Sequence, residues 1–257
     1  DSMNLSKISS LLLAFACSAC QGANFYSVND DIMMGAQAFD EVKETEEVLY
    51  SGPEFDQVQR VTARLVEAAR KVDPSIANSF NWEVCVIRED DTVNAFCLPG
   101  GKMAVYTGIL PVAGSDAGLA VVLGHEIAHA TLRHGTQRVT QGALTQIGIE
   151  VFTQNVEISD DESEREMATI LAEVGLGLPF SRSHELEADE AGLTYMATAG
   201  YNPEEAVGFW QRMASKSAGA PPEWLSTHPS DSNRIRQIKE LLPKVMPIYK
   251  SSEHGLQ

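Results

Sequence analysis

The chain has 257 residues, 44% of them hydrophobic, and a formal net charge of −17. This composition is that of a globular protein and excludes a disordered, collagen-like or polytopic membrane protein. The negative charge also argues against binding to nucleic acid or to anionic lipid, because both need a surface rich in Lys and Arg. The length suits one large domain or two small ones with a sizeable core.

The first element in the chain is a short apolar run after Lys7. It holds about ten residues, too few for a bilayer span of roughly 20, and small residues and cysteines follow it, as in a secretory signal. Cys17 and Cys20 each follow an alanine, as in a bacterial lipoprotein signal. We therefore expect residues 1–19 to be a signal peptide of lipoprotein type. An amphipathic helix packed on the body is the alternative.

Removal of this segment would leave two cysteines, Cys85 and Cys97, in an oxidising compartment. The segments 81–88 and 93–97 look like strands on either side of a turn near Asp91. If they form an antiparallel hairpin, the two cysteines lie opposite each other and can pair. Two separate buried thiols are the equal alternative.

The rest of the chain shows mostly helical periodicity. The acidic stretch 40–47 is expected to be a solvated helix face. Further helices are predicted at 53–72, 115–134, 183–199, from Asn202, and at 231–242, where Pro243 ends the last one. Residues 136–178 are expected to form two helices around an acidic loop, 154–166, which either covers the cleft or is merely solvated. The prediction is a mostly helical α+β domain over residues 20–250 with a small sheet near 81–107, and a tail at 251–257.

The helix at 115–134 carries the sequence His125-Glu126-Ile127-Ala128-His129. Residues four apart share one helix face, so both imidazoles can reach one Zn²⁺, and Glu126 is near enough to act on a water there. This is the H-E-x-x-H arrangement of metalloproteases. Two histidines satisfied by chance are the alternative, which is weakened because the helix is otherwise apolar and its polar groups need partners.

A third ligand is expected on the helix at 183–199. A catalytic zinc takes three protein ligands and leaves one position for water. Glu185 and Asp189 share a helix face, so Glu185 can bind zinc while Asp189 accepts the free N–H of a zinc-bound histidine. We prefer Glu185 to His184 as the ligand. Glu187 points roughly 200° away from Glu185 and is expected to face solvent or to be structural.

These motifs resemble those of the zinc metallopeptidases that include HtpX, the CAAX prenyl proteases and the periplasmic BepA-type proteases. The resemblance covers about residues 30–242 and adds further ordered segments to the two helices above. These segments are Asn94-Ala95-Phe96-Cys97-Leu98-Pro99-Gly100-Gly101, Arg182, and Thr227-His228-Pro229 with Arg234-Ile235. The sequence shows no hydrophobic helices like those of HtpX and the prenyl proteases, so the soluble periplasmic branch fits better.

The resemblance implies a gluzincin-type fold, a small sheet beside the active-site helix, one Zn²⁺ per chain, and hydrolysis of peptide bonds with Glu126 as general base. The substrate carbonyl oxygen needs a stabilising donor, for which His228 and Arg234 are candidates. In the BepA branch the matching histidine can instead occupy the fourth zinc position and hold the enzyme latent. A capping histidine before Pro229 is a third role for His228. His134 is expected to be structural or to lie behind the ligands.

The segment Asn94, Ala95 and Phe96 is expected to bind substrate, because a strand edge can add an extended peptide. A tight turn without a substrate role is the alternative. The expected partners are protein or peptide substrates in extended form, with no nucleic acid, and with membrane contact only through an N-terminal lipid.

The leading hypothesis is an exported zinc metalloendopeptidase of a bacterial periplasm or outer-membrane lipoprotein. By resemblance, its substrates are misfolded or misassembled cell-envelope proteins. A latent zinc-binding chaperone-like or assembly module is the second hypothesis, and a small-molecule zinc hydrolase is the third.

Overall fold

The computed structural model describes residues 23–142, 179–216, 222–229 and 233–255. The first half contains α2 (Val28–Thr45), β1 (Val48–Leu49), α3 (Pro53–Val72), α4 (Pro74–Ala77), β2 (Glu83–Ile87), β3 (Ala95–Leu98), β4 (Lys102–Tyr106), α5 (Leu110–Ala113) and α6 (Asp116–Thr131). The second half contains α9 (Arg182–Thr198), α10 (Glu205–Lys216), α11 (Glu223–Thr227) and α12 (Arg234–Gly255). The predicted signal peptide and the acidic loop 154–166 lie outside the described residues.

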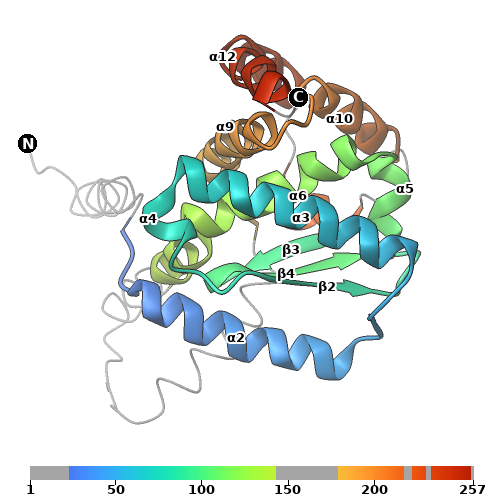
Figure 1. Ribbon diagram of the computed structural model, residues 1–257. Coiled ribbons are helices and arrows are strands. Elements are labelled where there is room, and N and C mark those ends of the chain that lie inside the picture. The colour runs from blue at the N-terminus through green and yellow to red at the C-terminus, as the bar shows by residue number, and fades with distance from the viewer. Residues whose placement is uncertain (1–22, 143–178, 217–221, 230–232, 256–257) are drawn as a thin grey trace, which may run out of the picture.

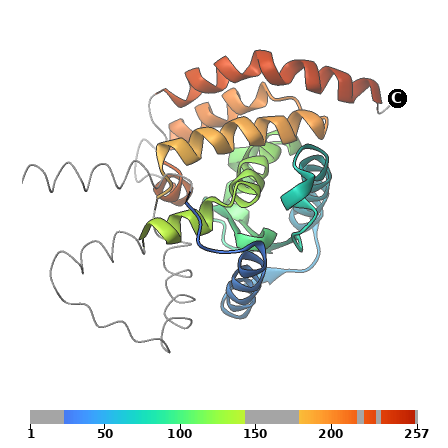
Figure 2. The same ribbon diagram turned by 90° about the vertical axis from the view of Figure 1, so that its left-hand side faces the viewer.

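A small mixed sheet lies between helices (Figure 1). Its strand order is β1-β2-β4-β3; β2 and β4 are parallel, and the other pairs are antiparallel. Helix α2 covers one face of the sheet, and α3 and α6 cover the other (Figure 1). The turned view shows α9, α10 and α12, drawn orange to red, as an outer layer on the side opposite α2 (Figure 2). The predicted fold class, mostly helical with a small sheet, is confirmed.

The predicted hairpin between the two cysteine-bearing strands is wrong. Strand β4 lies between β2 and β3, and Ala104 of β4 pairs with Cys85 on one side and with Phe96 on the other. Cys85 faces the cluster under α2, whereas Cys97 packs against the larger core on the α6 side. Because the two thiols are on opposite faces of the sheet, they do not pair, and both are free.

The predicted helix boundaries follow local signals in most cases. Pro53 is the first residue of α3, and the helix ends before Pro74, as expected. The helix that carries the H-E-x-x-H sequence is shorter than predicted: α6 ends at Thr131, and Arg133 adopts a left-handed backbone with φ of 58°. Residues 134–142 then form a separate helical segment, so His134 is not on the same helix as His129.

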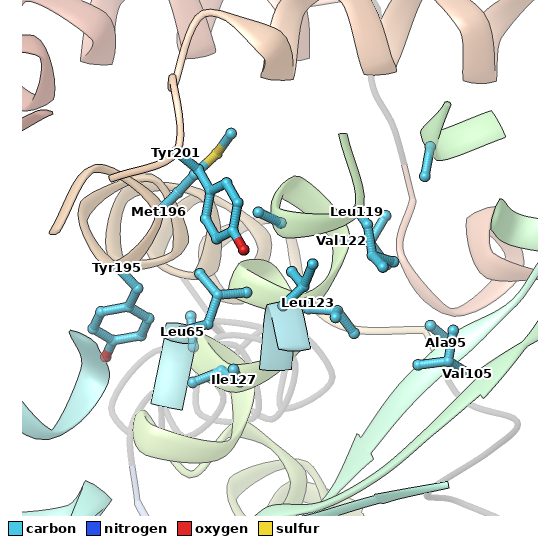
Figure 3. Close-up of a cluster of buried hydrophobic side chains, with 14 of the residues drawn as sticks. Leu65, Ala95, Val105, Leu119, Val122, Leu123, Ile127, Tyr195, Met196 and Tyr201 are labelled. Carbon is cyan, nitrogen blue, oxygen red and sulfur yellow. The ribbon is translucent and has the colours of Figure 1, made fainter. Parts of the chain in front are cut away.

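The larger core joins the sheet to α3, α6 and α9. Figure 3 shows Leu123 and Ile127 of α6 beside Leu65 of α3, with Tyr195 of α9 at the edge of the cluster. Helices α6 and α9 cross where Gly124 faces Gly192. A Cβ atom on Gly192 would lie 2.9 Å from the backbone nitrogen of His125. The glycine pair therefore lets the two ligand-bearing helices approach with their backbones nearly in contact.

Helix α12 is longer than predicted. It continues through Pro243 and Pro247 to Gly255, although proline removes a backbone donor and was expected to end it. Ile238 and Val245, on either side of Pro243, are both buried in the core, so tertiary packing holds the helix together. Among the described helices, none combines the length and apolar character needed to cross a membrane.

Candidate active site

Helix α6 brings its three polar motif residues into the interior. The Ser115 side chain accepts a hydrogen bond from the Gly118 amide and so begins the helix. His125, Glu126 and His129 follow on a helix that is otherwise apolar, and each is at most 3% exposed. Buried polar side chains need partners, so the neighbours of these three residues reveal their role.

Helix α9 supplies the first of these partners. It begins at Ser181, whose hydroxyl accepts from the His184 amide. One turn into the helix, Glu185 places its Oε2 atom 3.5 Å from His125 Nε2 and its Oε1 atom 3.3 Å from His129 Nε2. His184, the residue directly before Glu185, points elsewhere and stacks on His134 with ring centroids 4.3 Å apart.

His228 completes the cluster from a third direction. It follows α11 directly and is 1% exposed. Its Nδ1 atom lies 3.2 Å from His125 Nε2 and 3.1 Å from Glu185 Oε1. One ligand atom from each of His125, His129, Glu185 and His228 lies within 4.8 Å of the other three.

This donor set fits a zinc ion. The Nε2 atoms of His125 and His129 are 3.0 Å apart, and two ligands of a tetrahedral Zn²⁺ with Zn–N bonds near 2.1 Å are roughly 3.4 Å apart. Three imidazole nitrogens and a carboxylate oxygen lie close to one another in the interior. Such convergence suits a cation better than hydrogen bonding, because at most one hydrogen fits between each pair of nitrogens.

The electrostatic surroundings favour an anionic Glu185. Burial alone would raise its pKa, but His125 and the neighbouring histidines lower the pKa of Glu185 far below its usual value. Burial also lowers the pKa of His129 well below the ordinary value, so that its ring is a neutral ligand. At His125 burial acts in the same direction, yet Glu185 and Asp189 together raise the pKa to about 9. Metal binding at His125 therefore displaces a proton.

Behind the donor cluster lie Asp189 and Arg234. Asp189 Oδ1 is 3.0 Å from His125 Nδ1, the position required for its predicted role. Arg234, the first residue of α12, donates from Nη1 to Glu185 at 2.7 Å and from Nη2 to Asp189 at 2.7 Å. Its guanidinium lies over the ring of Trp210 at 3.9 Å. Arg234 thus contacts both carboxylates, and its Nη2 atom also lies 3.3 Å from His125 Nδ1. Its role as a carbonyl-stabilising donor stays a prediction.

Glu126 has a partner that the sequence did not indicate. The indole Nε1–H of Trp224 donates to Glu126 Oε1 at 2.8 Å, and Trp224 is fully buried. His228 Nε2 lies 3.4 Å from the same oxygen. Trp224 stands four residues before His228, just ahead of the segment Thr227-His228-Pro229, and this proximity is the signal that could have identified it.

The predicted substrate-binding segment, Asn94 to Phe96, lies at the start of β3, which is an edge strand of the sheet formed by the described residues. Asn94 accepts from the Ala95 amide at 2.9 Å and donates to Glu223 at 3.3 Å. Ala95 packs into the core on the α6 side. The Phe96 side chain lies on the opposite face, in the cluster under α2, so any contact of Phe96 with a substrate would be through its backbone.

The glycine turn after this strand has a packing role. Gly100 and Gly101 both have positive φ, 74° and 88°. A Cβ atom on Gly100 would lie 2.6 Å from the Ile32 Cα atom of α2. The turn therefore packs closely against α2.

Comparison with known proteins now bears on the identity of this site. The model described as peptidase family M48 matches residues 53–242, which is more than half of the chain. The mitochondrial metalloendopeptidase OMA1 of Saccharomyces cerevisiae is 34% identical over 209 residues, 77% of this chain and 58% of the relative. The same-named enzyme of Schizosaccharomyces pombe is 38% identical over 189 residues, 73% of this chain and 52% of the relative. The chain thus spans little more than half the length of these relatives.

These matches leave one expectation unconfirmed and contradict another. The β-barrel assembly-enhancing protease of Yersinia pestis is only 24% identical, over 228 residues, 86% of this chain and 46% of that protein. The BepA-type branch is therefore not confirmed. The predicted bacterial periplasm is contradicted, because the fungal relatives that match at higher identity are named as mitochondrial. That prediction depended on the N-terminal segment, which lies outside the described residues.

The central expectation is confirmed. The fold is a mostly helical metallopeptidase fold with a small mixed sheet, the cofactor is zinc, and four residues able to hold it are grouped in the interior. Taken together, the family match and the clustered ligand side chains show that the chain belongs to peptidase family M48.

Proposed function

We propose that this chain is a zinc-dependent endopeptidase, with His125, His129 and Glu185 as metal ligands and Glu126 as general base. The observation that carries the proposal is the buried cluster in which three imidazoles and one carboxylate converge within 4.8 Å. A purely structural zinc would have no use for a further buried carboxylate at its side, yet Glu126 is held there.

The residues around the metal site have separate roles in the proposed hydrolysis. Zinc, when bound, supplies a Lewis acid that lowers the pKa of a water towards about 7 and polarises a carbonyl. Glu126 accepts a proton from the attacking water and passes it to the leaving amide nitrogen. The Trp224 indole holds one oxygen of Glu126 at 2.8 Å, so the carboxylate is already oriented before substrate arrives.

Asp189 and Arg234 act on the ligands rather than on the substrate. Asp189 accepts from His125 Nδ1–H and so leaves Nε2 free for the metal. Arg234 neutralises the buried carboxylates of Glu185 and Asp189 through two hydrogen bonds. We therefore assign Arg234 as a positioning residue, and His228 as the side chain that remains closest to a substrate carbonyl.

The edge strand β3 is the proposed place for the substrate backbone. Tyr106 donates to the Asn94 carbonyl, and Phe96 pairs with Ala104 two residues on. In an antiparallel ladder the residues between such hydrogen-bonded pairs direct their backbone groups away from the partner strand. Ala95 and Cys97 therefore direct their backbone groups away from β4. The Ala95 N–H is held by the Asn94 side chain at 2.9 Å, so an extended peptide would pair with the Ala95 carbonyl and with Cys97.

This mode of binding favours unfolded substrates. A polypeptide must be extended over several residues to pair with a strand edge, and a folded protein rarely offers such a segment. We propose misfolded or misassembled proteins as the substrate class. The names of the relatives identify them as endopeptidases and do not name their substrates.

One observation favours a second candidate, a latent zinc-binding module. His228 Nδ1 lies within the donor cluster, at distances from His125 and Glu185 that match those between the other donors. In this arrangement His228 would be a fourth ligand and would occupy the position needed by water. Movement of α11, which carries Trp224, and of His228 directly after it would then be required for activity.

The test compares three purified proteins on an unfolded substrate such as casein, with zinc and with a chelator. We expect wild type or His228→Ala, or both, to cleave in a zinc-dependent manner. Glu126→Gln should still bind zinc, but its rate of substrate cleavage should be at least about a hundredfold lower. Activity only in His228→Ala would support the latent form. If neither wild type nor His228→Ala cleaves while zinc is bound, the endopeptidase proposal is wrong.

A further inference from the structure

The chain makes an abrupt turn immediately after α6. Arg133 takes a left-handed backbone with φ of 58°, which is uncommon for a non-glycine residue. Its guanidinium is held by the buried carboxylate of Asp31 on α2 and donates to the Tyr26 carbonyl at 2.6 Å. Contacts from a distant helix thus maintain a conformation that the local sequence would not choose.

The effect of this turn is to return His134 to the metal cluster. His134 is 0% exposed, and its Nδ1 atom lies 3.0 Å from Nδ1 of His129. Its Nε2 atom lies 3.3 Å from Oε2 of Glu187 on α9. Glu187 was expected to face solvent or to be structural; its side chain is 59% exposed and yet reaches His134.

The hydrogen positions along this chain of contacts follow from the ligand set. If His129 uses Nε2 for the metal, its remaining hydrogen is on Nδ1, and it donates to Nδ1 of His134. His134 then carries its own hydrogen on Nε2 and donates to Glu187. A ring that accepts at Nδ1 and donates from Nε2 is neutral.

We infer that His134, backed by Glu187, is a positioning residue that orients the metal ligand His129. The inference rests on the proposed ligand set. It gives each histidine of α6 its own partner: Asp189 contacts Nδ1 of His125, and His134 contacts Nδ1 of His129. Both supporting carboxylates, Asp189 and Glu187, are on α9.

The experiment measures zinc affinity by competition with a chromophoric chelator, so that its readout does not depend on activity. His134→Leu removes the acceptor for His129, and we expect it to weaken zinc binding about 10–100-fold. His134→Asn places an amide oxygen near the position of Nδ1, and we expect it to restore binding to within about fivefold of wild type. Circular dichroism establishes that each variant is folded.

Two carboxylates on α9, Glu187 and Glu190, provide a matched pair of substitutions. They test the contact between Glu187 and His134 without changing the buried ring itself. Glu187→Ala is expected to weaken zinc binding about threefold, whereas Glu190→Ala is expected to leave it unchanged. Glu190 is a suitable control because it also makes an exposed ion pair, with Lys244 at 2.9 Å. The absorption spectrum of the Co²⁺-substituted protein should change in His134→Leu and not in Glu190→Ala.

Failure of the inference is distinguishable from failure of the proposed ligand set. His129→Ala must abolish tight zinc binding if the ligand set is correct. With that result in hand, a folded His134→Leu that binds zinc within twofold of wild type overturns the positioning role. Equal losses in His134→Leu and His134→Asn also overturn it, because a merely structural role does not depend on the acceptor atom.

Discussion

The two histidines of α6 are supported in different ways. On the His125 side, Asp189 and Arg234 are both buried, and the guanidinium is enclosed by two carboxylates and the ring of Trp210. On the His129 side, a neutral His134 connects the ligand to an exposed carboxylate, Glu187.

The two sides are therefore expected to contribute differently, one to the stability of the folded protein and the other to the orientation of a metal ligand. A buried charge that loses its partner is costly, so loss of a partner on the His125 side should destabilise the folded protein. A neutral ring with an exposed partner can change at modest cost, because water replaces the lost contact. The first side therefore fixes the cluster, and the second refines the direction of one ligand.

The largest effect is expected from Arg234→Ala. The substitution leaves the buried carboxylates of Glu185 and Asp189 without their cation, which should lower the free energy of unfolding by about 3–5 kcal/mol. Thermal unfolding in the presence of a chelator measures this. Lys244→Ala is the matched control, because Lys244 joins the same two helices through an exposed pair with Glu190. Similar destabilisation by both variants would contradict the contrast between buried and exposed pairs.

Gly192→Ala tests whether both sides depend on the close crossing of α6 and α9. A Cβ atom there would lie 2.9 Å from the backbone of Gly124 and of His125. We expect a loss of about 1–3 kcal/mol in stability and roughly tenfold weaker zinc binding. Gly142→Ala serves as the control, since a Cβ atom on Gly142 meets nothing within 4 Å. Unchanged zinc affinity in Gly192→Ala would show that the crossing does not set the ligand distances.

Trp224→Phe separates the general base from the metal ligands. The variant keeps an aromatic ring but removes the hydrogen bond to Glu126, so cleavage should slow about 10–100-fold through misplacement of the carboxylate, while zinc affinity stays the same. In Trp82→Phe an indole hydrogen bond to the Ala77 carbonyl is lost far from the cluster, and the rate should not change. Equal cleavage rates for wild type and Trp224→Phe would show that Trp224 does not orient the general base.

The smallest effect is expected from a reducing agent. Because Cys85 and Cys97 lie on opposite faces of the sheet, neither side of the metal cluster depends on a disulfide. The midpoint of thermal unfolding should be the same with and without reductant, whereas loss of a disulfide would cost about 2–4 kcal/mol. A clear downward shift on reduction would contradict the strand order described above.

Most of the metal cluster could be predicted because its ligands occur in pairs at short sequence spacing. His125 and His129 are four residues apart on one helix, as are Glu185 and Asp189. Such spacing determines a shared face without knowledge of the tertiary fold. His228 could be named as a site residue only through the family resemblance, since nothing in its local sequence indicates which helix it faces.

The features that could not be predicted depend on contacts between distant segments. Strand β4 inserts between β2 and β3, which no local pattern reveals. The left-handed Arg133 is held by Asp31, about a hundred residues earlier, and α12 continues through Pro243 because its buried side chains pack on other helices. Trp224 lies 98 residues from Glu126 in the chain, so the hydrogen bond between them appears only in the folded protein.

The most direct test of the central claim is an anomalous difference map at the zinc absorption edge, from crystals grown with zinc. The account predicts one strong peak bonded to Nε2 of His125, Nε2 of His129 and the carboxylate of Glu185. A further bond to Nδ1 of His228 would identify the latent form. A well-ordered structure with no peak among these residues, or with the metal bound elsewhere, would contradict the account.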